Sequence, residues 1–202
     1  MYVIGLTGAI AVGKSTVAQM LAAKGAVVID GDQVVHALYA HNQALVARIA
    51  ERFGPAVLTP DGTLDRAALG RTVFPDPAAL ADLETLVFPH VLAEQERLLA
   101  QARRDGRSVA VLDAVKLVES GAGRLVDELW IVTAPVAAQQ RRLQDRGLDD
   151  DAIAARLATQ QPWEDKAGRF LQEPPPRPVV ILDNGGTLDE LAAQVERLWR
   201  GQ

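Results

Sequence analysis

Short apolar runs along the chain alternate with longer segments in which apolar positions recur every three or four residues. Each run is rich in β-branched residues and is almost uninterrupted by charge. The runs are Tyr2–Leu6, Ala26–Asp30, Ser108–Leu112, Glu128–Thr133 and Val179–Leu182. Such runs are typical of strands that are buried on both faces of a parallel sheet. The pattern therefore predicts an α/β fold with a five-stranded parallel sheet flanked by helices.

Two long segments between these runs are expected to add helices to the core. Residues 34–106 are mostly helical in pattern but are broken by the turn-rich GPAVLTPDGTLDR and by prolines that include Pro89. Residues 135–171 are charged, with periodic apolar positions at Leu143, Leu148, Ile153 and Leu157. We expect a single domain with a helical insertion at about 34–106 and a helical lid at about 135–171. Its core would comprise about 1–33, 107–134 and 172–202.

Composition and charge exclude several classes of function. The chain has 202 residues, of which 49% are apolar and 23% charged, as is ordinary for a soluble globular protein. Its net charge of −5 argues against a broad nucleic-acid interface, which needs a basic face. The chain has no cysteine, so disulfides, thiolate metal sites and thiol catalysis are excluded. No run approaches roughly 18 apolar residues and no signal peptide is evident, so we expect a cytoplasmic protein that does not associate with membranes.

The strongest motif is GAIAVGKS, Gly8–Ser15, which stands between the first predicted strand and a helix-like segment. This is the Walker A pattern in its expected setting, and it predicts binding of a nucleoside triphosphate. Gly8 and Gly13 allow the backbone to curl so that successive N–H groups, and the start of a helix at Lys14, face phosphate oxygens. Lys14 is expected to reach the β and γ phosphates, and the Ser15 hydroxyl to bind Mg²⁺. Thr16 is expected to pack or to cap the helix.

A second pattern, VVIDGD, places Asp30 and Asp32 at the end of the second predicted strand. Ligands of open parallel sheets bind beyond the carboxyl ends of the strands, so both carboxylates are expected near the phosphate loop. There one could accept a proton from an alcohol and the other could orient water bound to the metal. Alternatively, the segment is a simple turn in which Asp32 caps the following helix. The residues alone leave both interpretations open.

The segment LTGAIAVGKSTVAQMLAAKGAVVIDGDQVVH resembles the opening of dephospho-coenzyme A kinases, which pair a TGGIGSGKS-type loop with GA-x-VIDAD. Further blocks resemble that family in the same order along nearly the whole chain. They are IAERFG with DGTLDRAALGRTVF, LETLVFPHV, DELWIVTAPVAAQQRRLQDRG, ARLATQ with QPWEDK, and VILDNGGTLDELAAQVERLW. The order and spacing of the blocks make the resemblance specific, although single blocks are weak.

The resemblance implies a P-loop NTPase fold, with an acceptor-binding insertion, that transfers the ATP γ-phosphoryl group to the ribose 3′-hydroxyl of dephospho-coenzyme A with Mg²⁺. Asp32 would be the general base, and Asp30 would orient metal-bound water. Asp113, at the end of the third predicted strand, could serve the Mg²⁺ shell in the way of a Walker B acid. The ATP-binding residues would be Gly8, Ala9, Ile10, Ala11, Val12, Gly13, Lys14, Ser15, Thr16 and Asn184.

Arg142 and Arg146 match two arginines of the family's RL-x-x-R block. They stand four apart on a predicted lid helix, so they would share a face and stabilise phosphate charge as the lid closes. The alternative is a solvated helix face paired with the aspartates at 145, 149 and 150. Asn184 matches a position near the adenine of ATP, and its alternative is a simple turn former.

Several positions depart from the family pattern. Ala9, Ala11 and Val12 replace Gly, Gly and Ser in the loop, but the glycine, lysine and serine spacing is intact, so phosphate binding should survive. The segment RFLQEPPPRPVVILDN, residues 169–184, replaces the family's shorter AD-x-VI-x-N ending, so we expect a rebuilt loop over the adenine.

Other departures concern the acceptor side. Phe88 replaces a family histidine, and His90 is expected to be a partly buried helix residue. Val115 and Lys116 replace Pro and Leu, and Lys116 either meets an anionic acceptor or lies on the surface. Trp163 either touches the nucleotide or packs in the lid.

Two rival functions remain at this stage. The first is another P-loop kinase for a nucleotide or small molecule, and the block order argues against it. The second is a nucleotide-sensing protein that has lost phosphoryl transfer, which the retention of Asp30 and Asp32 argues against. The histidines lack the spacing of a transition-metal site, so we assign them no metal role. The residues give no indication of the oligomeric state.

Overall fold

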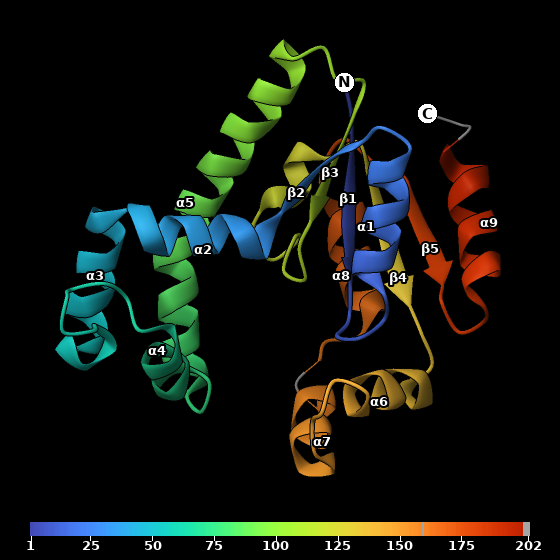
Figure 1. The fold of residues 1–202 in the computed structure, drawn as a ribbon. Helices are drawn as coiled ribbons and strands as arrows, with labels where there is room; N and C mark the ends of the chain where they lie inside the picture. Colours follow the sequence, from blue (N-terminus) through green and yellow to red (C-terminus); the bar gives the residue numbers. More distant parts are fainter. Residues whose placement is uncertain (159, 200–202) are drawn as a thin grey trace. The chain divides into compact units, whose positions relative to one another are not determined.

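The computed structural model describes residues 1–158 and 160–199. Five strands form one sheet in the order β2-β3-β1-β4-β5 (Figure 1), and the pairings β1 with β3, β1 with β4 and β4 with β5 are parallel. The strands are β1 (Tyr2–Gly8), β2 (Val27–Asp30), β3 (Val109–Asp113), β4 (Glu128–Thr133) and β5 (Val179–Asp183). The predicted five-stranded α/β fold is therefore confirmed, and the strands differ from their expected bounds by two residues at most.

One edge of the sheet gathers the segments that carry the candidate chemistry. Parallel pairing places Gly8 opposite Val132, and Thr133 opposite Asp183. Leu6 lies opposite Asp113 in the same way. The loops that follow β1, β3, β4 and β5 therefore emerge together at this edge, where open parallel sheets usually bind their ligands.

The chain divides into two compact units, which are described separately. The first comprises Met1–Ile29 with Leu99–Gln202, and the second comprises Asp30–Leu98. Helices of the first unit are α1 (Lys14–Ala23), η2 (Ala122–Leu125), α6 (Val136–Gln144), α7 (Asp150–Ala158), α8 (Trp163–Gln172) and α9 (Leu188–Trp199). Those of the second are α2 (Gly31–His41), α3 (Gln43–Phe53), η1 (Pro55–Val57) and α4 (Arg66–Val73), while α5 (Pro77–Arg104) runs from the second unit into the first. The division into core, insertion and lid made from the sequence stays a prediction.

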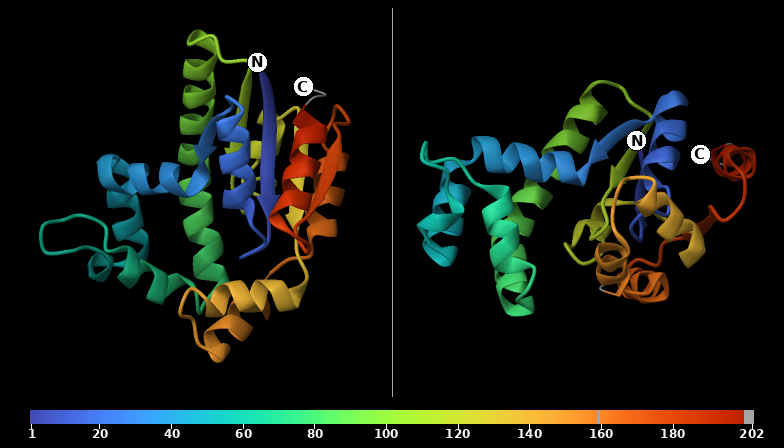
Figure 2. Two further views of the ribbon diagram at one scale, coloured as in Figure 1. Left: turned by 45° about the vertical axis from the view of Figure 1, so that its right-hand side comes forward. Right: turned by 60° about the horizontal axis from the view of Figure 1, so that its bottom comes forward.

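The core of the first unit lies between the sheet and the pair α1 and α9, while α8 lies on the opposite face against β4 (Figure 2). Residues on β1, α1 and α9, among them Ile4, Leu21 and Leu191, are completely buried there. Burying a side chain of this size stabilises the fold by about 1.5–3 kcal/mol. Trp130 is also fully buried, and its Nε1 donates to Glu128 Oε2 at 2.9 Å, so the indole leaves no unpaired donor in the core.

The segment expected to form a lid consists of two different parts. The predicted apolar positions Leu143 and Ile153 of α6 and α7 are buried together, and Leu148 and Leu157 pack against them. In contrast, α8 buries Phe170 completely and packs on β4, so it covers the sheet. Only α6 and α7 therefore retain the character expected of a lid.

In the second unit, α2, α3 and α4 each begin at a residue whose side chain caps the helix. Asn42 Oδ1 accepts the Leu45 N–H at the start of α3, and Asp65 caps α4 in the same way. Burial raises the pKa of Tyr39, an effect that the nearby Arg66 charge partly offsets. His90 is partly buried in α5 as expected, with its Nδ1 at 3.5 Å from Asn42 Nδ2.

The predicted break at Pro89 is wrong, because α5 continues through it. A proline inside a helix costs about 3 kcal/mol, since it removes one N–H and crowds the preceding turn. Its neighbours Val87 and Val91 are buried while Pro89 is exposed, so packing of the apolar face outweighs that cost.

The segment that follows α8 leads into the amino end of β5, where Pro178 O accepts the Leu129 N–H at 2.9 Å. Arg177 anchors it by donating to Val126 O at 3.0 Å and to Glu173 Oε2 at 2.8 Å. The expectation of a rebuilt loop over the adenine stays a prediction. No helix in the described part of the chain is both long and apolar enough to cross a bilayer.

Candidate active site

The phosphate loop occupies the turn between β1 and α1, and its two motif glycines are required by close contacts. Gly13 has φ 101°, and a Cβ atom there would overlap Asn184 Nδ2. A Cβ atom on Gly8 would overlap the carbonyl oxygen of Val132 on the neighbouring strand. The predicted turn is therefore confirmed, and the glycines also let β4 and the residue after β5 approach the loop.

Ala11, which stands where the family pattern has glycine, makes the loop part of an apolar cluster. Ala11 has φ 57°, a left-handed conformation that costs roughly 1–2 kcal/mol for a residue with a Cβ atom. Its methyl group is buried with Leu143 and Ile153. The adjacent Ile10 N–H donates to Gln160 Oε1 at 2.8 Å. The loop is thus joined to α6, to α7 and to the segment that follows α7.

Asn184 and Arg142 form a clamp that fixes the far side of the loop. Asn184 is 8% exposed, and its Nδ2 donates to Val12 O at 2.7 Å. Arg142 Nη1 donates to Ala11 O at 3.0 Å, and Nη2 donates to Asn184 O at 2.9 Å. The clamp residues join the loop, α6 and the turn after β5, so neither is only a surface residue or a turn former.

Lys14 and Asp113 meet beside the loop, with Lys14 Nζ at 3.5 Å from Asp113 Oδ1. Their side chains are 18% and 13% exposed, so both are within reach of a ligand at the edge of the sheet. Ser15 is exposed on the first turn of α1 and Thr16 is partly exposed. This arrangement places an ammonium group, a carboxylate and a hydroxyl at the start of a helix, where unpaired backbone N–H groups favour an anion such as phosphate.

A cavity of about 220 Å³ opens between the loop, α6 and the turn after β5. Arg142, Arg146 and Asn184 line it together with Gly13, Ser15 and Thr16. The expectation that both arginines share a helix face is wrong, because α6 ends at Gln144 and Arg146 lies in the following turn. Both arginines nevertheless line one cavity, since Asp145 between them keeps helical backbone angles.

Asp30 and Asp32 belong to the second unit, and their local roles differ from expectation. Asp30 is the N-cap of α2, since its Oδ1 accepts the N–H groups of Asp32 at 2.8 Å and of Gln33 at 3.2 Å. Asp32 is exposed in the first turn of that helix. The alternative in which Asp32 is the cap is therefore wrong, and Asp32 has a carboxylate that capping does not require.

Lys166 was not identified from the sequence, although it holds the segment after Asp113. It is 6% exposed, pairs with Glu119 and donates to Val115 O at 2.9 Å. The same carbonyl accepts the Thr7 hydroxyl at 3.0 Å. The sequence feature that could have identified Lys166 is its spacing from Phe170. The two are four residues apart, so both lie on the buried face of α8. Val115 and Lys116 are both exposed, which agrees with the interpretation of Lys116 as a surface residue.

In the residues that the structure describes, no three histidine, cysteine or carboxylate side chains gather as a metal site. Mg²⁺ in kinases is usually held by one or two protein groups together with phosphates and water. The Ser15 hydroxyl and the Asp113 carboxylate beside the loop fit that smaller donor set.

The chain was compared with known proteins. The family model described as dephospho-CoA kinase matches residues 2–188. A dephospho-CoA kinase of Symbiobacterium thermophilum is 47% identical over 99% of this chain and 81% of its own length. One of Geobacter sulfurreducens is 42% identical over 98% of both chains. The crystal structure of TT1252 from Thermus thermophilus covers 99% of this chain and 97% of its own, with a TM-score of 0.75 and 31% identity.

The clamp makes a prediction for Asn184→Asp, which replaces the amide donor by an acceptor that faces the Val12 carbonyl. We expect a loss of about 1–3 kcal/mol in unfolding free energy, because a buried carbonyl loses its donor. Asn42→Asp is the matched control, since Asn42 caps α3 through its oxygen and aspartate caps equally well. Urea denaturation measures both variants, and equal stability of the two would refute the clamp.

Proposed function

The chain belongs to the dephospho-CoA kinase family, and we propose that it transfers the γ-phosphoryl group of ATP to the ribose 3′-hydroxyl of dephospho-coenzyme A. The products are coenzyme A and ADP. The observation that carries the proposal is the cavity in which the phosphate loop meets two arginines and Asn184.

ATP occupies this cavity in the proposal. The loop amides from Gly8 to Thr16 surround the phosphates, and Lys14 supplies a positive charge to the β and γ groups. Arg142 and Arg146 face the same phosphates from α6 and the turn after it. Asn184 lies beside the nucleoside while it holds Val12 in place.

Ser15 and Asp113 would hold Mg²⁺, and Asp30 keeps the role that the family resemblance implies, the orientation of metal-bound water. When bound, the ion neutralises charge on the β and γ phosphates. Neighbouring side chains position Asp113. Its carboxylate pairs with Lys14 at 3.5 Å, and Lys166 fixes the segment after Asp113 by donating to Val115 O.

Asp32 is the proposed general base. Its carboxylate accepts the proton of the ribose 3′-hydroxyl as the oxygen attacks the γ-phosphorus, and the bond to the β-phosphate oxygen breaks. Because Asp30 supplies the helix cap, the Asp32 carboxylate is available for this proton. The proposed reaction does not depend on the expected cytoplasmic location or on the expected absence of nucleic-acid partners. It also does not depend on the oligomeric state.

The proposed function is tested by ADP release with a panel of acceptors that contains dephospho-coenzyme A, nucleoside monophosphates and sugars. We expect turnover with dephospho-coenzyme A above all others, and formation of coenzyme A in equal amount. Lys14→Ala supplies the background, because it removes the charge that the phosphates require. Preference for another acceptor would favour a different P-loop kinase, and ATP binding without turnover would favour a nucleotide sensor.

For the aspartates, we expect Asp32→Asn to lower turnover by roughly 100-fold with little change in ATP binding, because asparagine cannot accept the proton. Its stability should be unchanged, since the cap of α2 is Asp30. Asp30→Asn is the matched substitution, which keeps the cap and should raise the Mg²⁺ concentration needed for half-maximal turnover. The assay uses saturating ATP, Mg²⁺ and dephospho-coenzyme A. An Asp32→Asn enzyme within a few-fold of wild type would exclude Asp32 as the base.

For the arginines, we expect Arg142→Ala to lower both turnover and stability, because it deprives Ala11 O and Asn184 O of charged donors worth about 1–3 kcal/mol. Arg146→Ala should lower turnover with less than about 0.5 kcal/mol change in stability, since Arg146 is exposed in a turn. Turnover and urea denaturation distinguish the two. Loss of stability with normal turnover in either variant would show that its arginine is only structural.

A further inference from the structure

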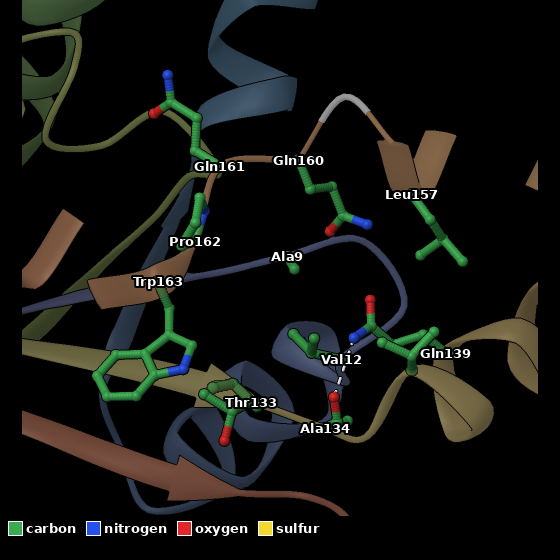
Figure 3. Close-up of a pocket in the computed structure, with 12 residues that line it drawn as sticks. Ala9, Val12, Thr133, Ala134, Gln139, Leu157, Gln160, Gln161, Pro162 and Trp163 are labelled. Carbon is green, nitrogen blue, oxygen red and sulfur yellow. Dashed lines mark hydrogen bonds between the residues drawn. The ribbon is translucent and has the colours of Figure 1, made fainter. Parts of the chain in front are cut away.

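A second cavity, of about 240 Å³, lies on the other side of the phosphate loop. Ala9 and Val12 of the loop line it, whereas Ala11 and Gly13 line the nucleotide cavity. The remaining walls come from the end of β4, the start of α6 and the segment that leads into α8 (Figure 3). Cavities that bind whole drug-sized ligands usually exceed about 300 Å³, so this space suits part of a larger molecule.

The lining of this cavity carries no charged side chain, and all 12 residues that form it are among those that the structure describes. The aliphatic part of the wall includes Val12, Val132, Ala134 and Leu157. The polar part consists of Thr133 and the amides Gln139, Gln160 and Gln161, and the Trp163 indole stands at the other side (Figure 3). A phosphate group would find no cation among these walls, so the cavity suits an uncharged group with both apolar and amide character.

Gln139 presents an unsatisfied acceptor to the cavity. It is 7% exposed, and its Nε2 donates to Ala134 O at 2.9 Å. A carbonyl oxygen can only accept, so the atom that faces Ala134 must be the nitrogen, and the orientation of the amide is fixed. Its Oε1 is buried and has no hydrogen-bond partner among the described residues. Buried polar atoms are nearly always paired, so this oxygen marks a place for an N–H or O–H of a ligand.

Gln160 presents the complementary group. Its Oε1 accepts the Ile10 N–H at 2.8 Å, and because that backbone group can only donate, the orientation of this amide is also fixed. Its Nε2 is therefore the end that offers a donor. Figure 3 shows the amides of Gln139 and Gln160 directed toward the same space beside Ala9. An acceptor and a donor between aliphatic walls match an amide group carried on an aliphatic chain.

We propose that this cavity binds the pantetheine arm of dephospho-coenzyme A, an assignment that rests on the proposed function. The arm is the part of either substrate that combines amide groups with methyl and methylene groups and carries no charge. An adenine ring also offers a donor, its exocyclic amine, but it has no methyl or methylene groups to match the aliphatic wall of Val12, Val132 and Leu157. The two sides of the phosphate loop thus take different chemistry, the ATP phosphates on one side and the neutral arm of the acceptor on the other.

The test compares Gln139→Leu with Gln140→Leu, the same substitution one residue further along α6 at an exposed position. Gln139→Leu should raise the KM for dephospho-coenzyme A about tenfold, the value of one neutral hydrogen bond, and leave the KM for ATP within about twofold. Gln140→Leu should leave both KM values unchanged. Calorimetry adds a direct readout: 4′-phosphopantetheine, which carries the arm, should lose affinity for Gln139→Leu, whereas AMP, which lacks it, should not.

A second variant tests the arm site independently, in case Gln139→Leu does not fold. Val136 is 58% exposed and lines the cavity, so Val136→Trp should fold normally while its ring fills the space. It should raise the KM for dephospho-coenzyme A in the same way, and an unchanged value would refute the arm site.

The outcomes separate this proposal from the proposed function. Wild-type protein without turnover on dephospho-coenzyme A would refute the function. Turnover with equal KM values in the Gln139→Leu and Gln140→Leu variants would refute the arm site alone. A raised KM for ATP would assign the cavity to the base of ATP, and weakened AMP binding would assign it to the adenine of the acceptor. Either result would overturn the arm site.

Discussion

The contact between Asn184 and the phosphate loop is the constraint on which the site depends. Asn184 Nδ2 lies where a Cβ atom of residue 13 would be, and it donates to the carbonyl of Val12. Only glycine at position 13 allows this approach, so the motif glycine and the residue after β5 specify each other. Arg142 completes the arrangement by donating to carbonyls on both segments. The loop is therefore held open by protein groups, which lowers the entropic cost of ordering it around phosphate.

The apolar residues of the loop couple it to α6 and α7. Ala11 adopts a conformation that favours glycine, but its methyl group is buried with Leu143 and Ile153, which offsets part of the backbone cost. A loop with glycine at this position would lack that contact. Because Ile10 also donates to Gln160, movement of the segment beyond α6 must disturb the loop itself. Ala11, which departs from the family pattern, thus joins the loop to the position of α6 and α7.

The sequence was sufficient for the sheet, the loop and most residues at its edge, because these rest on local patterns. Apolar runs identify buried strands, and the Walker A spacing identifies the turn. It was insufficient where tertiary contacts decide. The predicted break at Pro89 is wrong because Val87 and Val91 are buried on the apolar face of α5. The sequence left open whether Asp32 caps α2, and the hydrogen bonds give that role to Asp30. Lys166 was missed because a lysine rarely occupies a buried helix face, and here its pairing with Glu119 and its hydrogen bond to Val115 O allow it.

The distribution of charge around the loop suggests how two nucleotide-like substrates are kept apart. Both ATP and the proposed acceptor contain an adenosine and a diphosphate, so adenine recognition alone cannot distinguish them. Arginines line the cavity beside Gly13, whereas amides and aliphatic side chains line the cavity beside Ala9. A triphosphate in the neutral cavity would lose its hydration without gaining a cation, and that loss is severe for a charged group. The arm that only the acceptor carries would in turn leave its apolar surface in water if it lay among the arginines. The two substrates differ in the γ-phosphate of ATP and the neutral arm of the acceptor. The protein then distinguishes them because these two parts bind on opposite sides of a single loop.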